Sequence, residues 1–192
     1  MSIGNDSMLI GVTGKSGSGK STFAKALANQ LNYFYVDIDT IGHEVLSTPD
    51  VIQRLLNVYG TNIFVDGKLD RKLLGDLVFN DRHEMANLTD IVWTDMKAKI
   101  YNILKEHSNV VLDWILLPHT HYWNLLDKKI LIKADTDTRI QKVLERDNIS
   151  KEYFNKRESA SIVYTGQFDL VLENDYTLEK LNDNLKQTIG VL

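Results

Sequence analysis

The sequence contains no cysteine and only two prolines in 192 residues. Without cysteine there is no disulfide, no thiolate metal ligand and no cysteine nucleophile. No apolar run approaches the ~20 residues that a membrane-spanning helix needs, and residues 1–7 lack the basic-then-apolar pattern of a secretion signal. We therefore expect a cytoplasmic protein with a polar, frayed leader over residues 2–7.

The chain also has no excess of positive charge. Its 26 acidic and 22 basic residues give a net charge of −4 and a pI near 5.7. A general nucleic-acid binder needs a basic face, so this balance argues against nucleic acid as a partner, although a local basic groove remains compatible with it. With 43% hydrophobic and 25% charged residues, the composition is that of an ordinary globular domain.

Glycine and serine are concentrated in one short segment. Residues 14–21 fit the pattern G-x-x-x-x-G-K-[ST] completely. The apolar run 8–13 before them is typical of a buried parallel strand. The run 20–31 after them repeats Phe23, Leu27 and Leu31 on one helix face. A strand, a glycine loop and a helix in this order predict a nucleotide-phosphate site, and both flanks argue against a chance match by a Gly/Ser-rich turn.

The residue types in this loop suit the chemistry of a bound triphosphate. Glycines let backbone N–H groups approach the β-phosphate, and the positive end of the next helix faces the anion. Lys20 would reach the β and γ oxygens of ATP, and the Ser21 hydroxyl would ligate Mg²⁺. The predicted nucleotide contacts are Gly14, Lys15, Ser16, Gly17, Ser18, Gly19, Lys20, Ser21 and Thr22.

Strand and helix patterns alternate along the chain, which predicts an α/β fold with a five-stranded parallel sheet covered by helices on both faces. The expected strands are 8–13, 33–37, 109–113, 129–134 and 168–172, and the expected helices are 20–31, 40–47, 50–58, 70–80, 82–106, 137–147, 150–160 and 178–189. The long, mostly helical stretch between the second and third strands predicts an insertion over roughly 40–107 that forms a wall of the acceptor pocket. We expect one domain.

Acidic residues close two of the expected strands. Asp37 and Asp39 lie two apart, so on a strand they would share a face toward the phosphate site. Either could accept the proton of an attacking hydroxyl, and Asp39 is favoured; the alternative is that they cap a helix starting near Thr40. Asp113 ends the third strand, where it would hold Mg²⁺ through water or cap a loop.

Basic residues gather after the fourth strand, within a segment of roughly 139–165 that we expect to act as a lid. Phosphoryl transfer needs cations that close over the γ-phosphate, and Arg146 is favoured for this over Arg157 and Arg139. The alternative is a solvated helix face. His119 and His121 could ligate a metal, but nothing nearby completes a site, so we interpret them as loop residues beside aromatic ones. The alternative for His121, with Tyr122 and Trp123, is that they line the acceptor pocket.

Several of these segments resemble the dephospho-coenzyme A kinase family, and the similarity runs in order along nearly the whole chain. The shared segments are residues 11–22, Val36 to Asp39 with Ile41 and Glu44-Val45, Tyr59-Gly60, Asp66 to Leu74, Val78 to Asp81, Leu116-Leu117, Glu145 to Asp147, Arg157 and Val171 to Asn174. The loop alone indicates a P-loop NTPase. The D-x-D strand end together with D-G-x-L-D-R is far more particular to this family.

The resemblance implies ATP- and Mg²⁺-dependent phosphorylation of the ribose 3′-hydroxyl of dephospho-CoA. Asp39 would be the base, and Asp37, Asp39 and Arg71 would contact the substrate. Arg146 would be the lid arginine, and Asn174 would lie near the nucleotide base.

The chain departs from the family pattern at Trp93, Thr94, Pro118, His119 and Ser161, all on the acceptor or lid side. A nucleoside- or nucleotide-type kinase therefore stays open as the alternative. An NTP-driven switch and a nucleotide-binding module without catalysis are more distant ones.

Overall fold

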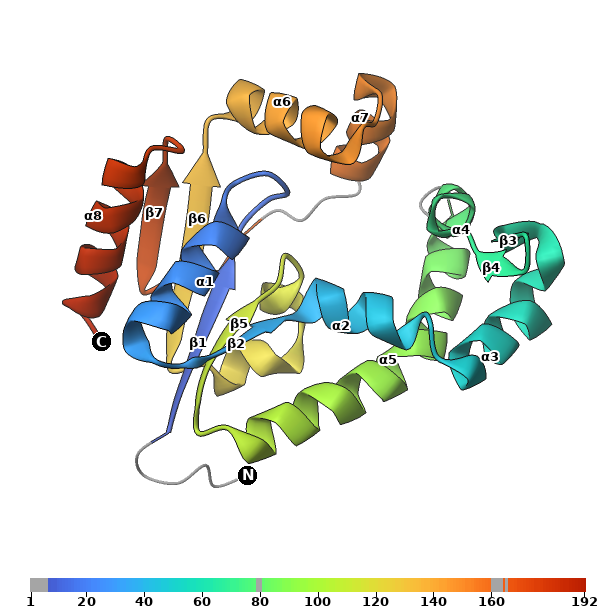
Figure 1. Ribbon diagram of the computed structural model, residues 1–192, viewed down its shortest axis with the longest axis horizontal. Helices are drawn as coiled ribbons and strands as arrows, with labels where there is room; N and C mark the ends of the chain where they lie inside the picture. Colours follow the sequence, from blue (N-terminus) through green and yellow to red (C-terminus); the bar gives the residue numbers. More distant parts are fainter. Residues whose placement is uncertain (1–6, 79–80, 160–163, 165) are drawn as a thin grey trace. The chain divides into compact units, whose positions relative to one another are not determined.

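The described part of the chain is built around one parallel sheet. The computed structural model describes residues 7–78, 81–159, 164 and 166–192. The strands lie in the order β2-β5-β1-β6-β7, and every neighbouring pair is parallel (Figure 1). Their bounds are β1 Met8–Thr13, β2 Phe34–Asp37, β5 Asn109–Asp113, β6 Lys128–Ala134 and β7 Leu170–Asn174.

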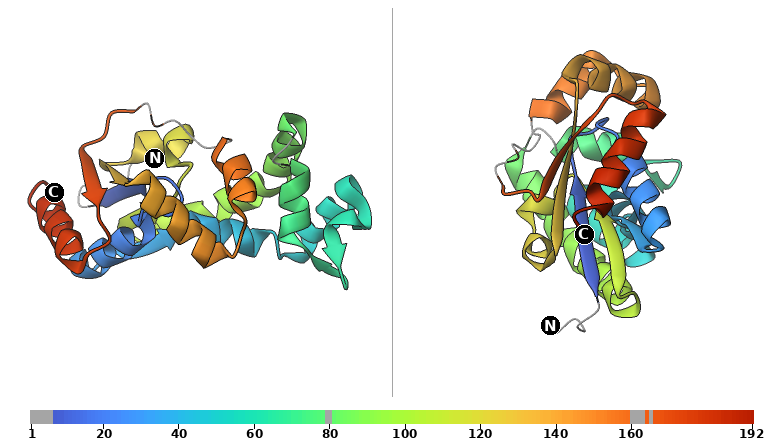
Figure 2. Two further views of the ribbon diagram at one scale, coloured as in Figure 1. Left: turned by 90° about the horizontal axis from the view of Figure 1, so that it is seen from above. Right: turned by 90° about the vertical axis from the view of Figure 1, so that its left-hand side faces the viewer.

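Apolar side chains of the central strand enter layers on both faces of the sheet. Ile10 and Val12 are fully buried and belong to a core with side chains of α1 (Lys20–Leu31) and α8 (Leu178–Ile189). On the opposite face, a Cβ on Gly11 would collide with side chains of Leu117 and Leu126, so this glycine lets η2 (Leu117–His119) and the residue after η3 (His121–Leu125) pack close to the strand. Helices thus cover both faces, as predicted (Figure 2).

Two further helices follow β6. The first, α6 (Thr136–Asp147), is capped by Asp135, whose side chain accepts a hydrogen bond from the Thr138 amide. It ends at Asn148 in the left-handed conformation, and α7 (Lys151–Ser159) follows after a short connection. Both helices contribute side chains that contact the glycine loop.

Residues 39–103 form a separate compact unit, whereas 1–38 and 104–192 form the unit that holds the sheet. The unit of residues 39–103 is made of α2 (Ile38–Val45), α3 (Pro49–Tyr59), η1 (Gly60–Ile63), β3 (Phe64–Val65), β4 (Lys68–Leu69), α4 (Arg71–Val78) and most of α5 (Arg82–Glu106). Its buried side chains include Val51, Leu55, Ile63 and Leu74. The single domain with an insertion at roughly 40–107, and the lid at roughly 139–165, stay predictions.

Most predicted elements occur where the sequence placed them. The strands 8–13 and 109–113 and the helices 20–31, 82–106 and 178–189 match in both bounds. The last strand was predicted at 168–172 but spans Leu170–Asn174, two residues later. The small hairpin of β3 and β4 was not predicted; its two-residue turn, Asp66-Gly67, has φ of 50° and 73°, as a tight hairpin turn requires.

Candidate phosphate-binding and phosphoryl-transfer site

Residues 14–19 join β1 to α1 and form a loop that its neighbours approach very closely. Gly17 and Gly19 have φ of 81° and 86°, in the left-handed region. A Cβ on Gly17 would lie 2.7 Å from the Arg139 carbonyl oxygen, and one on Gly19 would collide with the side-chain amide of Asn174. Glycine is required at both positions because of both the backbone conformation and the space.

Three successive carbonyl groups of this loop are bound by side chains from the C-terminal half of the chain. Arg139 Nη1 donates to Ser16 O at 3.0 Å, Tyr176 Oη to Gly17 O at 2.9 Å, and Asn174 Nδ2 to Ser18 O at 2.8 Å. The donors come from α6, from the end of β7 and from just beyond it. The loop is therefore held in place through three of its carbonyl oxygens.

The helix that follows the loop begins without a side-chain cap. Its N-cap is Gly19, and no side chain of the described residues accepts a hydrogen bond there. The first N–H groups of a helix have no intrahelical partner, and the helix dipole adds positive potential at this end. An uncapped N-terminus beside a glycine loop is a site for an anion such as a phosphate.

The lysine of the motif is paired with a buried carboxylate. Lys20 Nζ lies 3.1 Å from Asp113 Oδ1 and donates to Ser21 Oγ at 3.2 Å. Asp113 is fully buried at the carboxyl end of β5, and its other oxygen, Oδ2, accepts a hydrogen bond from Tyr35 Oη at 2.9 Å. Asp113 thus holds the ammonium group at the first turn of α1, beside the Ser21 hydroxyl.

Tyr35 stays protonated in this setting. Burial raises the pKa of its phenol, and the charge and hydrogen bond of Asp113 raise it further. A protonated phenol remains a donor to Asp113, so that carboxylate keeps one oxygen satisfied. Its Oδ1 accepts no hydrogen bond from the described residues and lies near Lys20 by charge alone.

The oxygen ligands expected for Mg²⁺ lie close together here. Ser21 Oγ and the Asp113 carboxylate are hard donors of the kind that Mg²⁺ prefers, and both contact Lys20. The buried Oδ1 without a hydrogen bond is a further sign that this corner accommodates a cation. Among the described residues, no three His, Cys, Asp or Glu side chains form a metal cluster. The residues therefore fit a Mg²⁺ ion that shares its ligands with a nucleotide.

The strand geometry predicted for Asp37 and Asp39 is wrong. Strand β2 ends at Asp37, which is the register neighbour of Asp113, and α2 begins at Ile38. Asp39 therefore lies in the first helical turn, where a carboxylate is favoured by the dipole, and the two-residue alternation of a strand does not relate it to Asp37. A helix that starts at Ile38 also excludes the predicted start near Thr40. The catalytic assignment of Asp39 stays a prediction.

The basic residues after β6 divide into an exposed group and a buried one. The side chain of Arg146 is 61% exposed and forms an ion pair with Asp147. Arg139 is only 3% exposed and reaches the loop carbonyl of Ser16. The structure thus brings Arg139, which the sequence ranked behind Arg146, to the phosphate loop. The side chain of Arg157 and residue Ser161 lie outside the described residues.

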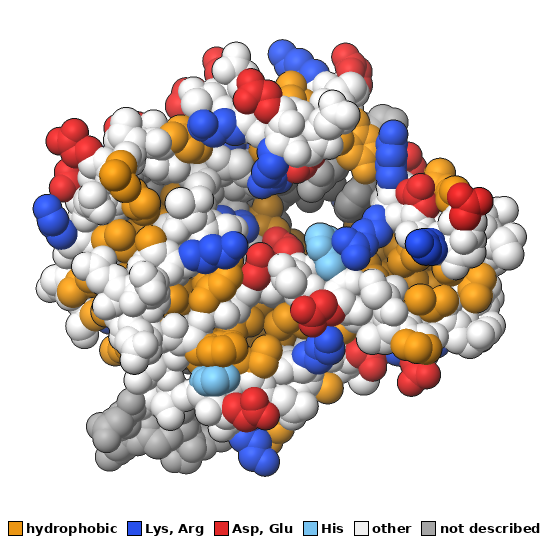
Figure 3. Space-filling model, viewed as in Figure 1, with side chains coloured by type: hydrophobic (Ala, Val, Ile, Leu, Met, Phe, Trp, Pro, Cys, Tyr) orange, Lys and Arg blue, Asp and Glu red, His pale blue; other side chains and the backbone are white. Residues whose placement is uncertain are grey.

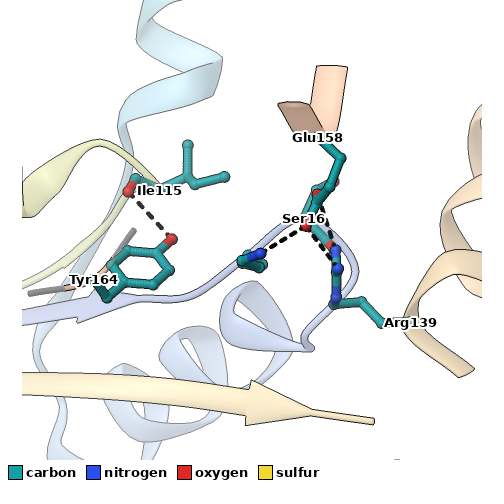
Figure 4. Close-up of polar contacts among 6 residues, drawn as sticks. Ser16, Ile115, Arg139, Glu158 and Tyr164 are labelled. Atoms are coloured by element: carbon teal, nitrogen blue, oxygen red, sulfur yellow. Dashed lines mark hydrogen bonds and ion pairs between the residues drawn. The ribbon is translucent and has the colours of Figure 1, made fainter. Parts of the chain in front are cut away.

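Glu158 of α7 connects the loop to Arg139. Its Oε1 accepts from Lys15 Nζ and from Arg139 Nη2, each at 2.8 Å (Figure 4). Burial disfavours the charged form of Glu158, but hydrogen bonds from both cations outweigh it and keep its pKa below the ordinary value. Nearby, Tyr164 Oη donates to the Ile115 carbonyl, and burial raises the pKa of Tyr164 to about 12.

The remaining predicted residues lie as follows. Asn174 ends β7, and its side chain supports the loop and accepts a hydrogen bond from the Tyr176 amide at 3.0 Å.

Arg71 begins α4 in the second compact unit, is exposed, and donates to the His43 carbonyl at 3.4 Å. His119 is the last residue of η2, and His121 lies against the ring of Tyr122 at 4.0 Å.

The sequence reasoning did not identify Tyr35, Glu158, Tyr164 or Tyr176 as part of this site. For Tyr176 a signal existed, because polar residues just beyond the end of a parallel strand face the ligand side of the sheet. Glu158 carried no such signal, since a glutamate in a charged helix is ordinary.

On the face drawn in Figure 3, basic and acidic side chains are interspersed. No helix in the described ranges is long and apolar enough to cross a membrane.

Comparison with known proteins identifies the family of this chain. A family model described as dephospho-CoA kinase matches residues 8–180. The chain belongs to the dephospho-CoA kinase family. The dephospho-CoA kinase of Fusobacterium nucleatum is 28% identical over 181 residues, covering 91% of this chain and 93% of that protein. A crystal structure from Thermus thermophilus is 29% identical, with a TM-score of 0.82 over 97% of this chain and 98% of that one.

The fold extends to more distant members of this family. The dephospho-CoA kinase structure from Campylobacter jejuni is 23% identical, with a TM-score of 0.57 over 95% of both chains. The family match makes the chain a kinase, and its fold is that of the P-loop kinases, which use ATP.

Proposed function

We propose that this protein transfers the γ-phosphoryl group of ATP to the ribose 3′-hydroxyl of dephospho-CoA, giving CoA and ADP. The family match over residues 8–180 carries the proposal, because it spans the phosphate loop, the acidic strand ends and the second compact unit together. The glycine loop, Lys20 and Asp113 supply the geometry that ATP chemistry needs.

The nucleotide would lie on residues 14–22. Backbone N–H groups of the loop and of the first turn of α1 bind phosphate oxygens, while Arg139, Tyr176 and Asn174 hold the loop carbonyls from outside. Lys20, held by Asp113, would exchange part of that contact for the β and γ oxygens of ATP. Such charged donors are already oriented, so they need little rearrangement as charge develops.

Ser21 and Asp113 would hold Mg²⁺ with the nucleotide. When bound, the ion supplies charge neutralisation at the β and γ oxygens. Lys20 and the buried Tyr35–Asp113 hydrogen bond fix the positions of both ligands.

The acceptor chemistry would use residues near the end of β2 and in the second unit. Asp39 would accept the proton of the 3′-hydroxyl as its oxygen attacks the γ-phosphorus, while the bond to the bridging oxygen breaks and ADP leaves. Asp37 and Arg71 would bind the acceptor. Arg146 would stabilise the charge on the transferred phosphoryl group.

The direct test measures ADP release and identifies the product by mass spectrometry and ³¹P NMR. We expect acceptor-dependent ADP with dephospho-CoA and a new 3′-phosphomonoester in equal amount. A parallel panel contains nucleosides, nucleoside monophosphates and other cofactor precursors. ADP release with one of these but not with dephospho-CoA would replace the substrate assignment, and equal ADP release without any acceptor would indicate a hydrolase or switch.

A further inference from the structure

One carboxylate bridges two cations that belong to different parts of the phosphate site. Glu158 Oε1 accepts from Lys15 Nζ at 2.8 Å and from Arg139 Nη2 at 2.8 Å, and Oε2 accepts from Arg139 Nη1 at 3.3 Å. Lys15 belongs to the glycine loop, Arg139 to α6 and Glu158 to α7. The pairing with Arg139 uses both carboxylate oxygens, which fixes direction as well as distance (Figure 4).

The two arms of this bridge differ in burial. The side chain of Lys15 is 42% exposed, so its pairing with Glu158 is screened by solvent. The side chain of Arg139 is 4% exposed, and that of Glu158 is 22% exposed. A buried guanidinium needs a carboxylate partner, and Glu158 is the one that contacts it among the described side chains. The ion pair between Glu158 and Arg139 is therefore the one that fixes the local structure.

Arg139 also forms a hydrogen bond with the loop. The same Nη1 that contacts Glu158 donates to the Ser16 carbonyl at 3.0 Å. Ser16 lies in the first half of the loop, whereas Gly17 and Ser18 are held by Tyr176 and Asn174. Without Glu158, Arg139 would turn toward water or another anion and release the Ser16 carbonyl.

We propose that Glu158 is a positioning residue for ATP: through Arg139 it holds the Ser16 carbonyl outward and so orients the first half of the phosphate loop. The inference rests on the proposed use of ATP but not on the acceptor. Because Tyr176 and Asn174 hold the rest of the loop, losing Glu158 weakens phosphate binding without abolishing it. We expect about a tenfold loss, typical of a supporting contact that shifts the orientation of a binding group.

The test compares Glu158→Gln with Glu152→Gln, a matched change at an exposed position of the same helix. Isothermal titration calorimetry measures the binding of ADP and of a non-hydrolysable ATP analogue, with concentrations corrected for folded protein. Glu158→Gln is expected to weaken both about tenfold and to raise the KM for ATP, with the KM for the acceptor unchanged. Glu152→Gln is expected to bind as the wild type does.

The conservative variant Glu158→Asp separates positioning from a purely structural role. It keeps the charge on a shorter side chain, so it should restore part of the nucleotide affinity, whereas Glu158→Gln should not. Hydrogen exchange of the loop amides 14–19 should speed up in Glu158→Gln alone.

If Glu158→Gln lowers thermal stability but leaves nucleotide affinity and the KM for ATP at wild-type values, Glu158 is structural only and the inference fails. Tighter binding of ATP would overturn it too, because Glu158 would then compete with the phosphates for the two cations. A wild-type protein that binds no nucleotide would instead refute the proposed function.

Discussion

The phosphate loop and the unit of residues 39–103 are stabilised by contacts of different kinds. The loop is held by side chains that lie far away in sequence, on α6, β7 and α7, and Arg139 among them is buried. In the unit of residues 39–103, ion pairs such as Lys99 with Glu44 and Arg54 with Asp95 are about half-exposed, and Arg71 is solvent-accessible. The difference indicates a phosphate loop held by contacts distant in sequence and a unit of residues 39–103 whose surface contacts are freer to change.

The acceptor residue with the largest expected effect is Asp39. Asp39→Asn removes the proton acceptor but keeps the side-chain volume, so kcat should fall about 10²- to 10⁴-fold. The KM for ATP should stay unchanged, as measured by steady-state kinetics. Asp50→Asn is the matched control, because Asp50 also lies in the first turn of a helix in this unit and is exposed. A kcat for Asp39→Asn within a few-fold of wild type would remove Asp39 from the mechanism.

On the nucleotide side, Lys20→Ala should lower kcat by about 10²- to 10³-fold, as the loss of one strong donor to a transition-state oxygen does. It also leaves the buried Asp113 without its cation, so thermal stability should fall as well. Lys105→Ala, on the exposed last turn of α5, serves as the control. Near-normal turnover after Lys20→Ala would mean that the loop does not hold the triphosphate.

A smaller effect is expected for Arg71→Ala on the acceptor side. A hydrogen bond to a charged group contributes about 1.5–3 kcal/mol, so the KM for dephospho-CoA should rise about tenfold or more. The KM for ATP should not change, and Lys72→Ala should leave both constants as they are. If Arg71→Ala raised the KM for ATP instead, the residue would belong to the nucleotide subsite.

The smallest effect concerns stability at alkaline pH. The pKa of Tyr164 is raised from 10.0 to about 12 in the folded protein. Because the pKa is higher in the folded than in the unfolded state, the protonated phenol of Tyr164 contributes to the free energy of unfolding. This contribution is fully present below pH 10 and is lost as the pH rises from about 10 to about 12. Tyr164→Phe has no phenol to titrate. Between pH 10 and pH 12, its free energy of unfolding should therefore fall by about 2 kcal/mol less than that of the wild type. Urea unfolding at several pH values measures this, with the exposed Tyr101→Phe as control; parallel curves for Tyr164→Phe and wild type would contradict the prediction.

The sequence predicted the parts of the molecule that depend on local pattern. The loop, the flanking strand and helix, and the order of elements follow from spacing and apolar periodicity, which act within about ten to twenty residues. It could not place Arg139, Glu158 and Tyr176 on the loop, because their contacts join residues more than one hundred positions apart. It also misplaced Asp39, since a strand that continues directly into a helix leaves no turn residue to mark the boundary.

The same distances govern when the protein can acquire its ligand. Strand β1 is synthesised first, yet its sheet neighbours β5 and β6 lie about a hundred residues later. Two of the donors that hold the glycine loop, Asn174 and Tyr176, lie 156 and 159 residues after the carbonyl groups that they bind. A nascent chain on the ribosome should therefore gain nucleotide affinity only after residues 174–176 have been made, and ATP should then stabilise the folded protein.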